Sequence, residues 1–243
     1  MSTSPIKKAG FAQGIYQTSS TAKEALGTRR QLKDGREFVY AQAGAADLAA
    51  GKLGVAADVA AAHADEDILA AVAIGTKILS VTVTAGTAIA ANALKDGAFQ
   101  INDGTGQGYS YPIEGNSAIS GSGTVVKLTL AEGIKVALDT TSEFTLVHNP
   151  WKGIVESTTV ACPVGVPVVA VTTLYYYWAQ THGLACVLMG DTVALGTDVI
   201  QDTSTVAGGT AIMATGSVIP AVGTVHGFAG VDTEYQPVIL KIT

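Results

Sequence analysis

The histidines and cysteines of this chain are the residues best able to bind metals or take part in catalysis, but their spacing matches no known metal-binding or catalytic pattern. Among the 243 residues, both types are few and widely scattered: His63, His148, His182, His226, Cys162 and Cys186. No two histidines stand three or four residues apart, and the cysteines match no metal-binding or disulfide pattern. The sequence therefore predicts no metal, no cofactor, and cysteines that stay reduced, as in a protein made in a cytoplasm.

The pair closest to a catalytic arrangement is Cys186 with His182, a thiol four residues after an imidazole. In a β-strand such residues lie about 13 Å apart along the axis, too far for the histidine to take the thiol proton. Cys186 also follows Ala185 and precedes Val187 and Leu188, a setting typical of core packing. The chain has no GxSxG or HExxH motif. We predict that it is not an enzyme.

Two loops carry polar residues at short spacing. The glycine-rich stretch 102–108 superficially resembles a phosphate-binding loop, but it lacks the GxGxxG spacing and a following Lys-Ser or Lys-Thr pair. We interpret it as the tip of a hairpin between strands at 98–102 and 109–113. The acidic cluster Asp65, Glu66 and Asp67 lacks the alternating oxygen ligands and glycine turn of a calcium loop, which indicates a solvated loop.

Short β-strands, rather than helices, are the elements that must carry these residues. Alternating apolar and polar residues predict strands at 36–40, 78–84, 98–102, 109–113, 125–130 and 144–147, with 125–130 and 144–147 as a second pair. From 191 to 242, short apolar runs alternate with turns. The expected fold is all-β, with an extended basic N-terminal arm (1–35) and two β-sandwich or barrel-like domains (36–155 and 156–243). The alanine-rich residues 59–72 leave helix and loop both open.

The stretch 168–188 is the expected centre of this fold. Strand geometry places Tyr175, Tyr177 and Ala179 on one face and Tyr176, Trp178 and Gln180 on the other. Because both faces carry large rings, we expect both to be covered. Gly183 permits a break, so residues 184–188 are predicted to return as the next strand of a central hairpin.

Charge is distributed unevenly along the chain. Residues 1–40 carry seven basic and three acidic side chains, a net of +4, whereas the remainder carries seven lysines and seventeen acids, a net of −10. All three arginines lie in the first 36 residues. Such an arm could grip an acidic protein surface or nucleic acid, or be only a soluble tail. No apolar run is long enough to span a membrane, and the N-terminus does not read as a signal peptide.

Five stretches, 28–40, 101–113, 146–153, 176–183 and 232–238, resemble virion structural proteins of tailed bacteriophages, marine ones in particular. The resemblance runs from about residue 28 to the C-terminus and is to capsid decoration, or cement, proteins. It implies a non-enzymatic protein on the outer surface of an icosahedral head. The implied partners are the major capsid protein and copies of the chain itself, as a homotrimer, with no membrane and no direct nucleic-acid contact.

On this interpretation the arm contacts the capsid and exposed aromatic rings contact other copies. The predicted capsid contacts are Lys7, Lys8, Arg29, Arg30 and Arg36, and the predicted contacts between copies are Trp151, Tyr175 and Tyr177. One alternative is a tail or fibre component. Another is a carbohydrate-binding module or glycosidase, which needs an exposed aromatic platform, for which Trp151 and Trp178 are candidates, or two carboxylates about 5–10 Å apart.

Overall fold

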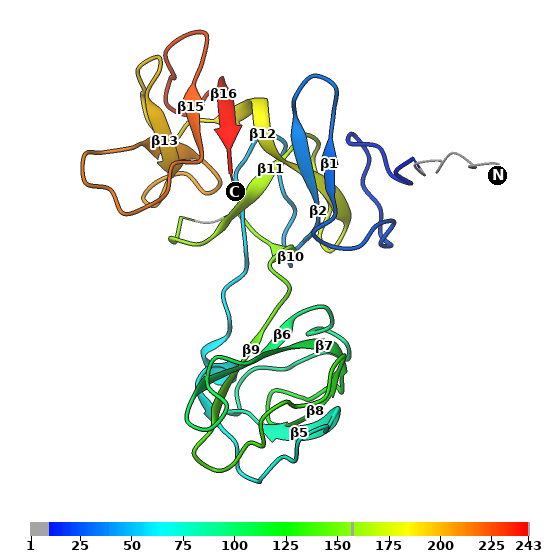
Figure 1. Cartoon of the computed structure of the whole chain (residues 1–243). Helices are drawn as coiled ribbons and strands as arrows, with labels where there is room; N and C mark the ends of the chain where they lie inside the picture. The colour runs from blue at the N-terminus through cyan, green and yellow to red at the C-terminus, as the bar shows by residue number, and fades with distance from the viewer. Residues whose placement is uncertain (1–9, 157, 243) are drawn as a thin grey trace, which may run out of the picture. The chain divides into compact units, whose positions relative to one another are not determined.

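The structure is a computed structural model of the chain and describes residues 10–156 and 158–242. Within those residues the regular structure consists of β-strands and one short 3-10 turn, with no α-helix (Figure 1). The prediction of an all-β fold is confirmed. The elements, in chain order, are β1 (Arg29–Gln31), β2 (Glu37–Ala43), β3 (Gly54–Val55), η1 (Ala61–His63), β4 (Glu66–Asp67), β5 (Ile78–Thr82), β6 (Ala98–Asp103), β7 (Ser110–Asn116), β8 (Val125–Leu130), β9 (Glu143–Val147), β10 (Lys152–Ile154), β11 (Pro163–Pro167), β12 (Tyr176–Leu188), β13 (Asp198–Gln201), β14 (Thr210–Ile212), β15 (Gly223–Val225) and β16 (Tyr235–Lys241).

The chain divides into two compact units, and the division differs from the predicted boundaries at 35 and 155. Unit 1 combines Met1–Ala57 with Trp151–Thr243, and unit 2 is Asp58–Pro150. Strand β2, which we expected in the first domain, instead pairs with β12 far along the chain. A two-way backbone bridge between Val55 and Val155 joins the segments on either side of unit 2. Unit 2 is therefore an insertion into unit 1.

The long strand β12 is the centre of unit 1. It pairs antiparallel with β2 through Tyr176–His182 and with β16 through His182–Leu188. The predicted hairpin at Gly183 is wrong, because the chain continues straight on as a single 13-residue strand. Gly183 has φ 83°, next to the point where the register against β2 shifts. The glycine thus serves a bulge, where the strand passes from one partner to the next, and not a turn.

Both faces of β12 are covered over residues 177–181, as the aromatic pattern predicted. Tyr177 and Ala179 lie in one buried cluster with Val39 and Ala41. Trp178 lies in another with Phe38, Tyr40 and Ile15. Tyr40 and Trp178 pack edge to face, with ring centroids 5.0 Å apart. Burial of aromatic rings on both sides makes this strand the main source of packing in its half of unit 1.

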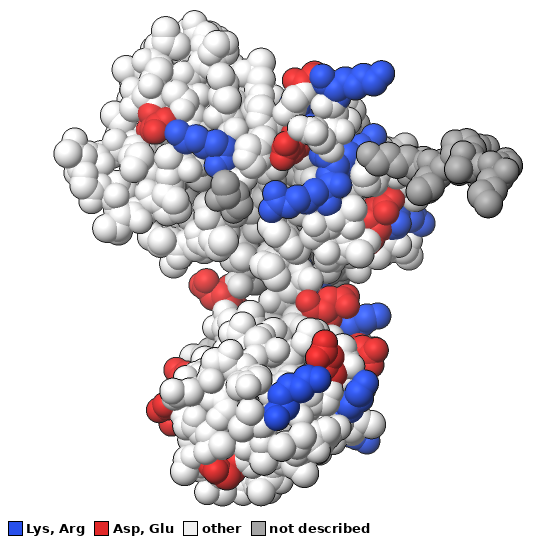
Figure 2. Space-filling view, viewed as in Figure 1, with Lys and Arg blue, Asp and Glu red and all other residues white. Residues whose placement is uncertain are grey.

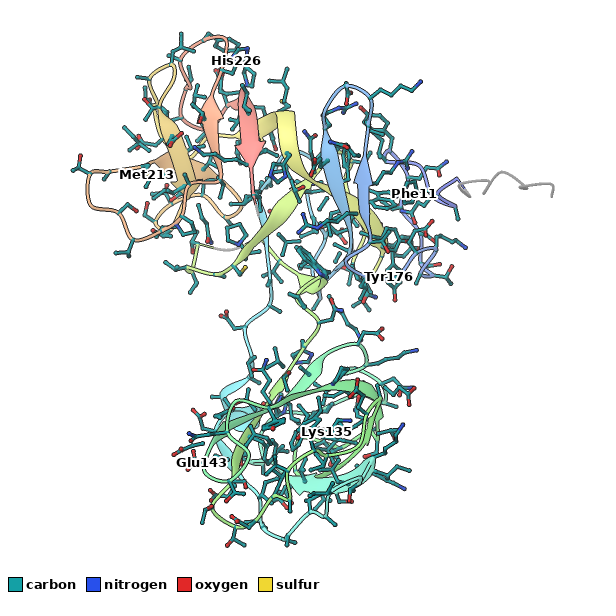
Figure 3. All side chains as sticks on the ribbon, in the orientation of Figure 1. Phe11, Lys135, Glu143, Tyr176, Met213 and His226 are labelled. Carbon is teal, nitrogen blue, oxygen red and sulfur yellow. The ribbon has the colours of Figure 1, made fainter. Side chains whose placement is uncertain are left out.

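The segment that covers Trp178 comes from the predicted N-terminal arm. The Trp178 indole N–H donates to the Gln13 carbonyl at 3.0 Å, and Ser19 and Tyr176 exchange backbone hydrogen bonds of 3.0 and 2.8 Å. Phe11 packs edge-on against Trp178, with ring centroids 5.1 Å apart. Figure 3 labels Phe11 at the right-hand edge of unit 1. Residues 10–31 are therefore part of the fold, and the expectation of an extended arm is wrong for them. Residues 1–9 lie outside the described residues.

Unit 2 contains the predicted strands with small shifts at their ends. β6 and β7 form the predicted hairpin. The predicted pairing of β8 with β9 is wrong, because β8 lies between β5 and β7 and β9 lies between β4 and β6. The segment 66–82 runs antiparallel to 125–144 along its whole length, for example at the Val72–Leu138 bridge. The sheet is consequently barrel-like, around a core that includes Phe99 and Phe144. In place of a helix, residues 59–72 form loops, η1 and β4.

Candidate functional site

The structure separates the predicted capsid-contact residues by what they touch. The Arg30 guanidinium lies 4.8 Å from the Phe11 ring centroid and donates to the Gln13 carbonyl at 3.0 Å. The Arg36 Nε lies 2.8 Å from an Asp34 carboxylate oxygen. Arg29 is exposed and forms no side-chain hydrogen bond or ion pair within the described residues. Lys7 and Lys8 lie outside those residues. Arg30 and Arg36 therefore bind within their own chain, and Arg29 alone among the described residues of this set faces solvent unpaired.

Asp34 and Arg36 form an ion pair at the turn before β2, and this pair lowers the pKa of Asp34. The backbone N–H and the guanidinium of Arg36 both donate to its carboxylate, and these bonds lower the pKa of Asp34. The pair is exposed, so solvent screening leaves it a small effect on stability. Its role is to order the turn at residues 32–36.

The residues predicted to contact other copies are buried or half-buried within unit 1. Tyr177 is 0% exposed, so the prediction that it contacts another copy is wrong. Burial raises the pKa of its hydroxyl, which has no hydrogen-bond partner among the described residues. Trp151 and Tyr175 are half-buried and pack against the same cluster. Trp178 is 1% exposed, which removes it from any sugar-binding platform.

The polar residues singled out in the sequence do not gather into a catalytic centre. His182 Nδ1 lies 3.2 Å from Thr181 Oγ1 and 3.7 Å from Glu37 Oε2. The predicted burial of Cys186 is wrong, since its side chain is exposed. In the described part of the chain, no three His, Cys, Asp or Glu side chains are placed to hold a metal. No helix in that part is long and apolar enough to cross a membrane.

The two polar loops have structural roles in unit 2. The stretch 102–108 is the predicted tip of the β6–β7 hairpin, with turns stabilised by Gly104 and Gly106 at positive φ. The acidic residues 65–67 are not a free loop, because Glu66 and Asp67 form β4. Asp67 and Asp103 both stand opposite Glu143 in the register of β9, so three carboxylates are neighbours across the strands. Like charges placed in this way repel one another.

Unit 1 contains a cavity that the sequence did not indicate, lined by apolar, aromatic and basic residues. Its volume is about 470 Å³, and it lies where β12 passes from β2 to β16. We call it the β12 groove. Its lining combines backbone and side chains of β12 with aromatic and basic residues from elsewhere in unit 1: Tyr16, Arg36, Ala50, Gly51, Val166, Pro167, Val168, Gln180, Leu184, Ala185, Cys186 and Tyr235. This lining is mainly apolar, and its carbonyls and N–H groups come from a strand edge.

The second feature is an uncharged surface at the β13–β15 end of unit 1. Residues 192–231 contain only two Asp, Glu, Lys or Arg side chains, Asp198 and the buried Asp202. Figure 2 shows a broad area without charge over β13 and β15, and Figure 3 labels Met213 and His226 there. The stretch exposes large apolar side chains, namely Leu195, Ile212, Val218, Phe228 and Val231. We call these five residues the apolar surface of unit 1.

No protein-family model, curated protein or solved structure matches this chain. A proposal for its function therefore depends on the geometry and surface chemistry described above.

Proposed function

We propose that the chain is a non-enzymatic decoration protein that binds the outer surface of a phage head and stabilises the capsid lattice. Its partners on this proposal are the major capsid protein and further copies of the chain, assembled as a homotrimer. The observation that carries the proposal is the apolar surface of unit 1. Val218 is 97% exposed and Phe228 57% exposed, on a stretch almost free of charge.

A surface of this kind is typical of proteins that are covered in an assembly. Exposed apolar side chains on a surface with few charges are typical of interaction sites, and interface centres are depleted of charged residues. The sheet architecture of both units adds a rigid scaffold. Repetition of one modest contact over a symmetric shell gives strong total binding by multivalency.

The structure changes how the basic residues enter this proposal. Deletion of residues 1–30 would uncover Trp178 and remove Gln13 and Ile15, so it would unfold unit 1 as well as remove charge. Arg29, which is exposed, together with Lys7 and Lys8, is the better candidate for contact with an acidic capsid surface. The variant Lys7→Glu, Lys8→Glu, Arg29→Glu reverses these charges without opening the core.

The test is binding to isolated phage heads that lack the protein, followed by sedimentation and cryo-EM of the decorated particles. We expect density on the outer face of the head, and loss of binding in the charge-reversed variant at physiological salt. Density at the tail or fibres alone would support the tail-component alternative instead.

A second variant tests the apolar surface directly. Val218→Asp with Phe228→Asp places two charges on it, and we expect loss of both trimer formation and head binding. The matched control is Leu69→Asp with Ile74→Asp, two exposed apolar residues of unit 2. If the control abolishes assembly and the unit 1 variant does not, the contact surface has been assigned to the wrong unit.

A further inference from the structure

The β12 groove has the size and composition of a site for a small molecule. Its volume of about 470 Å³ lies within the range of about 300–1,000 Å³ that is usual for ligand pockets. Val166, Pro167 and Val168 form part of an apolar wall, and the side chains of Gln180 and Arg36 add polar groups. In ligand sites, apolar walls bury the bound molecule and a few polar groups fix its orientation. The polar atoms of this groove therefore indicate which class of molecule would fit.

Gln180 requires a hydrogen-bond donor from the occupant. Its side chain lines the groove although the residue is only 1% exposed. The side-chain Nε2 donates to the carbonyls of His182, at 3.1 Å, and Leu184, at 2.9 Å. Both partners can only accept, so the amide cannot be reversed and Oε1 remains an acceptor. No group in the described part of the chain donates to Oε1, which leaves this oxygen for an occupant.

Arg36 offers hydrogen-bond donors but little net charge. Its Nε lies 2.8 Å from the Asp34 carboxylate, which balances the charge of the guanidinium. Nη1 lies 3.5 Å from the Tyr16 hydroxyl, and Nη2 donates to no group among the described residues. The occupant should therefore accept a hydrogen bond from Arg36. A negative charge on the occupant would gain little, because the Asp34 carboxylate is already there.

Two exposed tyrosine rings are the third feature of the groove. Tyr16 is 62% exposed and Tyr235 is 45% exposed, and both line the groove. A Cβ built on Gly51 would lie 2.6 Å from the Tyr235 ring, so this ring lies directly against the Gly51 backbone. The face of a tyrosine ring packs well against the C–H groups of a molecule whose hydroxyls point outward to polar partners. The rings of saccharides have this amphipathic form.

The same contacts argue against two other classes of occupant. An ionised carboxylate only accepts hydrogen bonds, so it would leave Gln180 Oε1 without a donor, at a cost of roughly five- to hundredfold in affinity. An added peptide strand would have to bond the Cys186 carbonyl, but Gly51 already lies against it, since a Cβ on Gly51 would be 3.0 Å from that oxygen. A saccharide hydroxyl both donates and accepts, so neighbouring hydroxyls can satisfy Gln180 and Arg36 together.

We propose that the β12 groove binds a neutral saccharide. A sugar ring packs against Tyr235 and Tyr16, one hydroxyl donates to Gln180 Oε1, and another accepts from the Arg36 guanidinium. Because Trp178 is buried, these two tyrosines take the place of the aromatic platform that a sugar site needs. This inference concerns the isolated protein and does not rest on the proposed capsid function, so either proposal can fail alone.

The native thiol of Cys186 reports whether the groove is occupied. Cys186 is exposed and lines the groove, and in a Cys162→Ser background it is the sole thiol of the full-length chain. The probes are glucose, galactose, mannose, N-acetylglucosamine, maltose, cellobiose and lactose at millimolar concentration. The measurements are the rate at which Cys186 reacts with a chromogenic disulfide reagent and, in parallel, binding by titration calorimetry. We expect at least one sugar to slow the reaction, by about tenfold at about ten times its Kd, since only the unoccupied groove reacts.

Three results would overturn the proposal. They are no protection of Cys186 by any of these sugars, calorimetric binding of a sugar that leaves the Cys186 rate unchanged, and protection by decanoate, an apolar carboxylate, in place of the sugars.

Substitution of a groove tyrosine separates this site from sugar contacts elsewhere on the protein. With the sugar that binds most tightly, Tyr235→Ala should weaken binding about three- to tenfold, because it removes one ring contact. Tyr235→Phe keeps the ring and should retain the affinity. The matched control is Tyr109→Ala in unit 2, where the ring is 43% exposed and lies outside the groove. An equal loss in Tyr109→Ala, or none in Tyr235→Ala, would place the sugar elsewhere and contradict the assignment.

Discussion

The two units are both all-β, yet they are built from sequence in different ways. Unit 2 is one continuous segment whose sheet includes the local β6–β7 hairpin. Unit 1 is assembled from both ends of the chain, and its central strand β12 takes one neighbour from residues 37–43 and another from 235–241. The comparison shows that similar strand content can come from near or distant pairings. Distant pairings require larger loops to close before contacts form, so we expect unit 1 to fold more slowly.

The tryptophans allow the two units to be followed separately. Both Trp151 and Trp178 lie in unit 1, whereas unit 2 has no tryptophan. Tryptophan fluorescence therefore reports the unfolding of unit 1, and far-UV circular dichroism reports both units.

The largest effect should come from Phe144→Ala, which removes a fully buried ring from the core of unit 2. Loss of such a ring costs about 3–5 kcal/mol. In urea, the circular dichroism transition of unit 2 should shift to lower concentration while the fluorescence transition stays in place. Phe38→Ala, at an equally buried site in unit 1, should shift the fluorescence transition instead. Coincident shifts in both signals would show that the units do not unfold independently.

An intermediate effect of opposite sign is expected for Tyr177→Phe in unit 1. The Tyr177 hydroxyl is fully buried and has no hydrogen-bond partner in the part of the chain that the structure describes, which costs about 1–3 kcal/mol of desolvation. Its removal should raise the urea midpoint measured by fluorescence. Tyr175→Phe is the control, because Tyr175 is only half-buried. A lower midpoint for Tyr177→Phe would indicate that the hydroxyl is solvated in solution.

The stability of unit 2 should depend on pH through His63, which is 2% exposed. Burial lowers the pKa of this imidazole, and the backbone of Thr87 and the nearby Glu66 carboxylate only partly oppose the effect. The unfolded chain therefore binds a proton more readily than the folded one, and unit 2 should lose stability as the pH falls below about 6.5.

Circular dichroism melts at pH 7 and pH 5 measure this dependence. His63→Leu should reduce the difference between the two melts, whereas His226→Asn, at an exposed position of unit 1, should not. An unchanged difference in His63→Leu would assign the pH dependence to other groups.

The smallest effect should come from Glu143→Gln, which relieves the repulsion from Asp67 and Asp103 on either side. Figure 3 shows Glu143 at the outside of unit 2, where water and salt screen the charges. We expect a gain of a few tenths of a kcal/mol, about 0.2–1, that shrinks at high salt. A gain that is unaffected by 1 M salt would point to a cause other than charge.

The alternation of apolar and polar residues determined where most strands of unit 2 lie. Residues 78–84 and 125–130 were predicted as strands from this pattern and correspond to β5 and β8. A period of two is a local property, because successive side chains of a strand point to opposite faces. The same property placed Tyr177 and Trp178 on opposite faces of one strand and predicted correctly that both are covered.

The candidate site could be predicted only in part. The sequence identified the basic residues of the N-terminal segment, but not that Arg30 stacks on Phe11 or that Arg36 pairs with Asp34. The β12 groove has no local signature, because it arises where β2 stops and Gly51 begins to contact β12. The apolar surface of unit 1 could have been suspected from the near absence of charge in residues 192–231.

The fold class, most strand positions and the two-sided burial around Tyr177 and Trp178 could be predicted from the pattern of residues, because they depend on near neighbours in the chain. The pairing partners, the insertion of unit 2 and the packing of residues 10–31 on Trp178 depend on contacts between distant segments, which no local pattern encodes. Gly183 illustrates the reason. A glycine at positive φ suits a turn or a bulge equally well, and the presence of β2 and β16 on opposite edges of β12 selects the bulge.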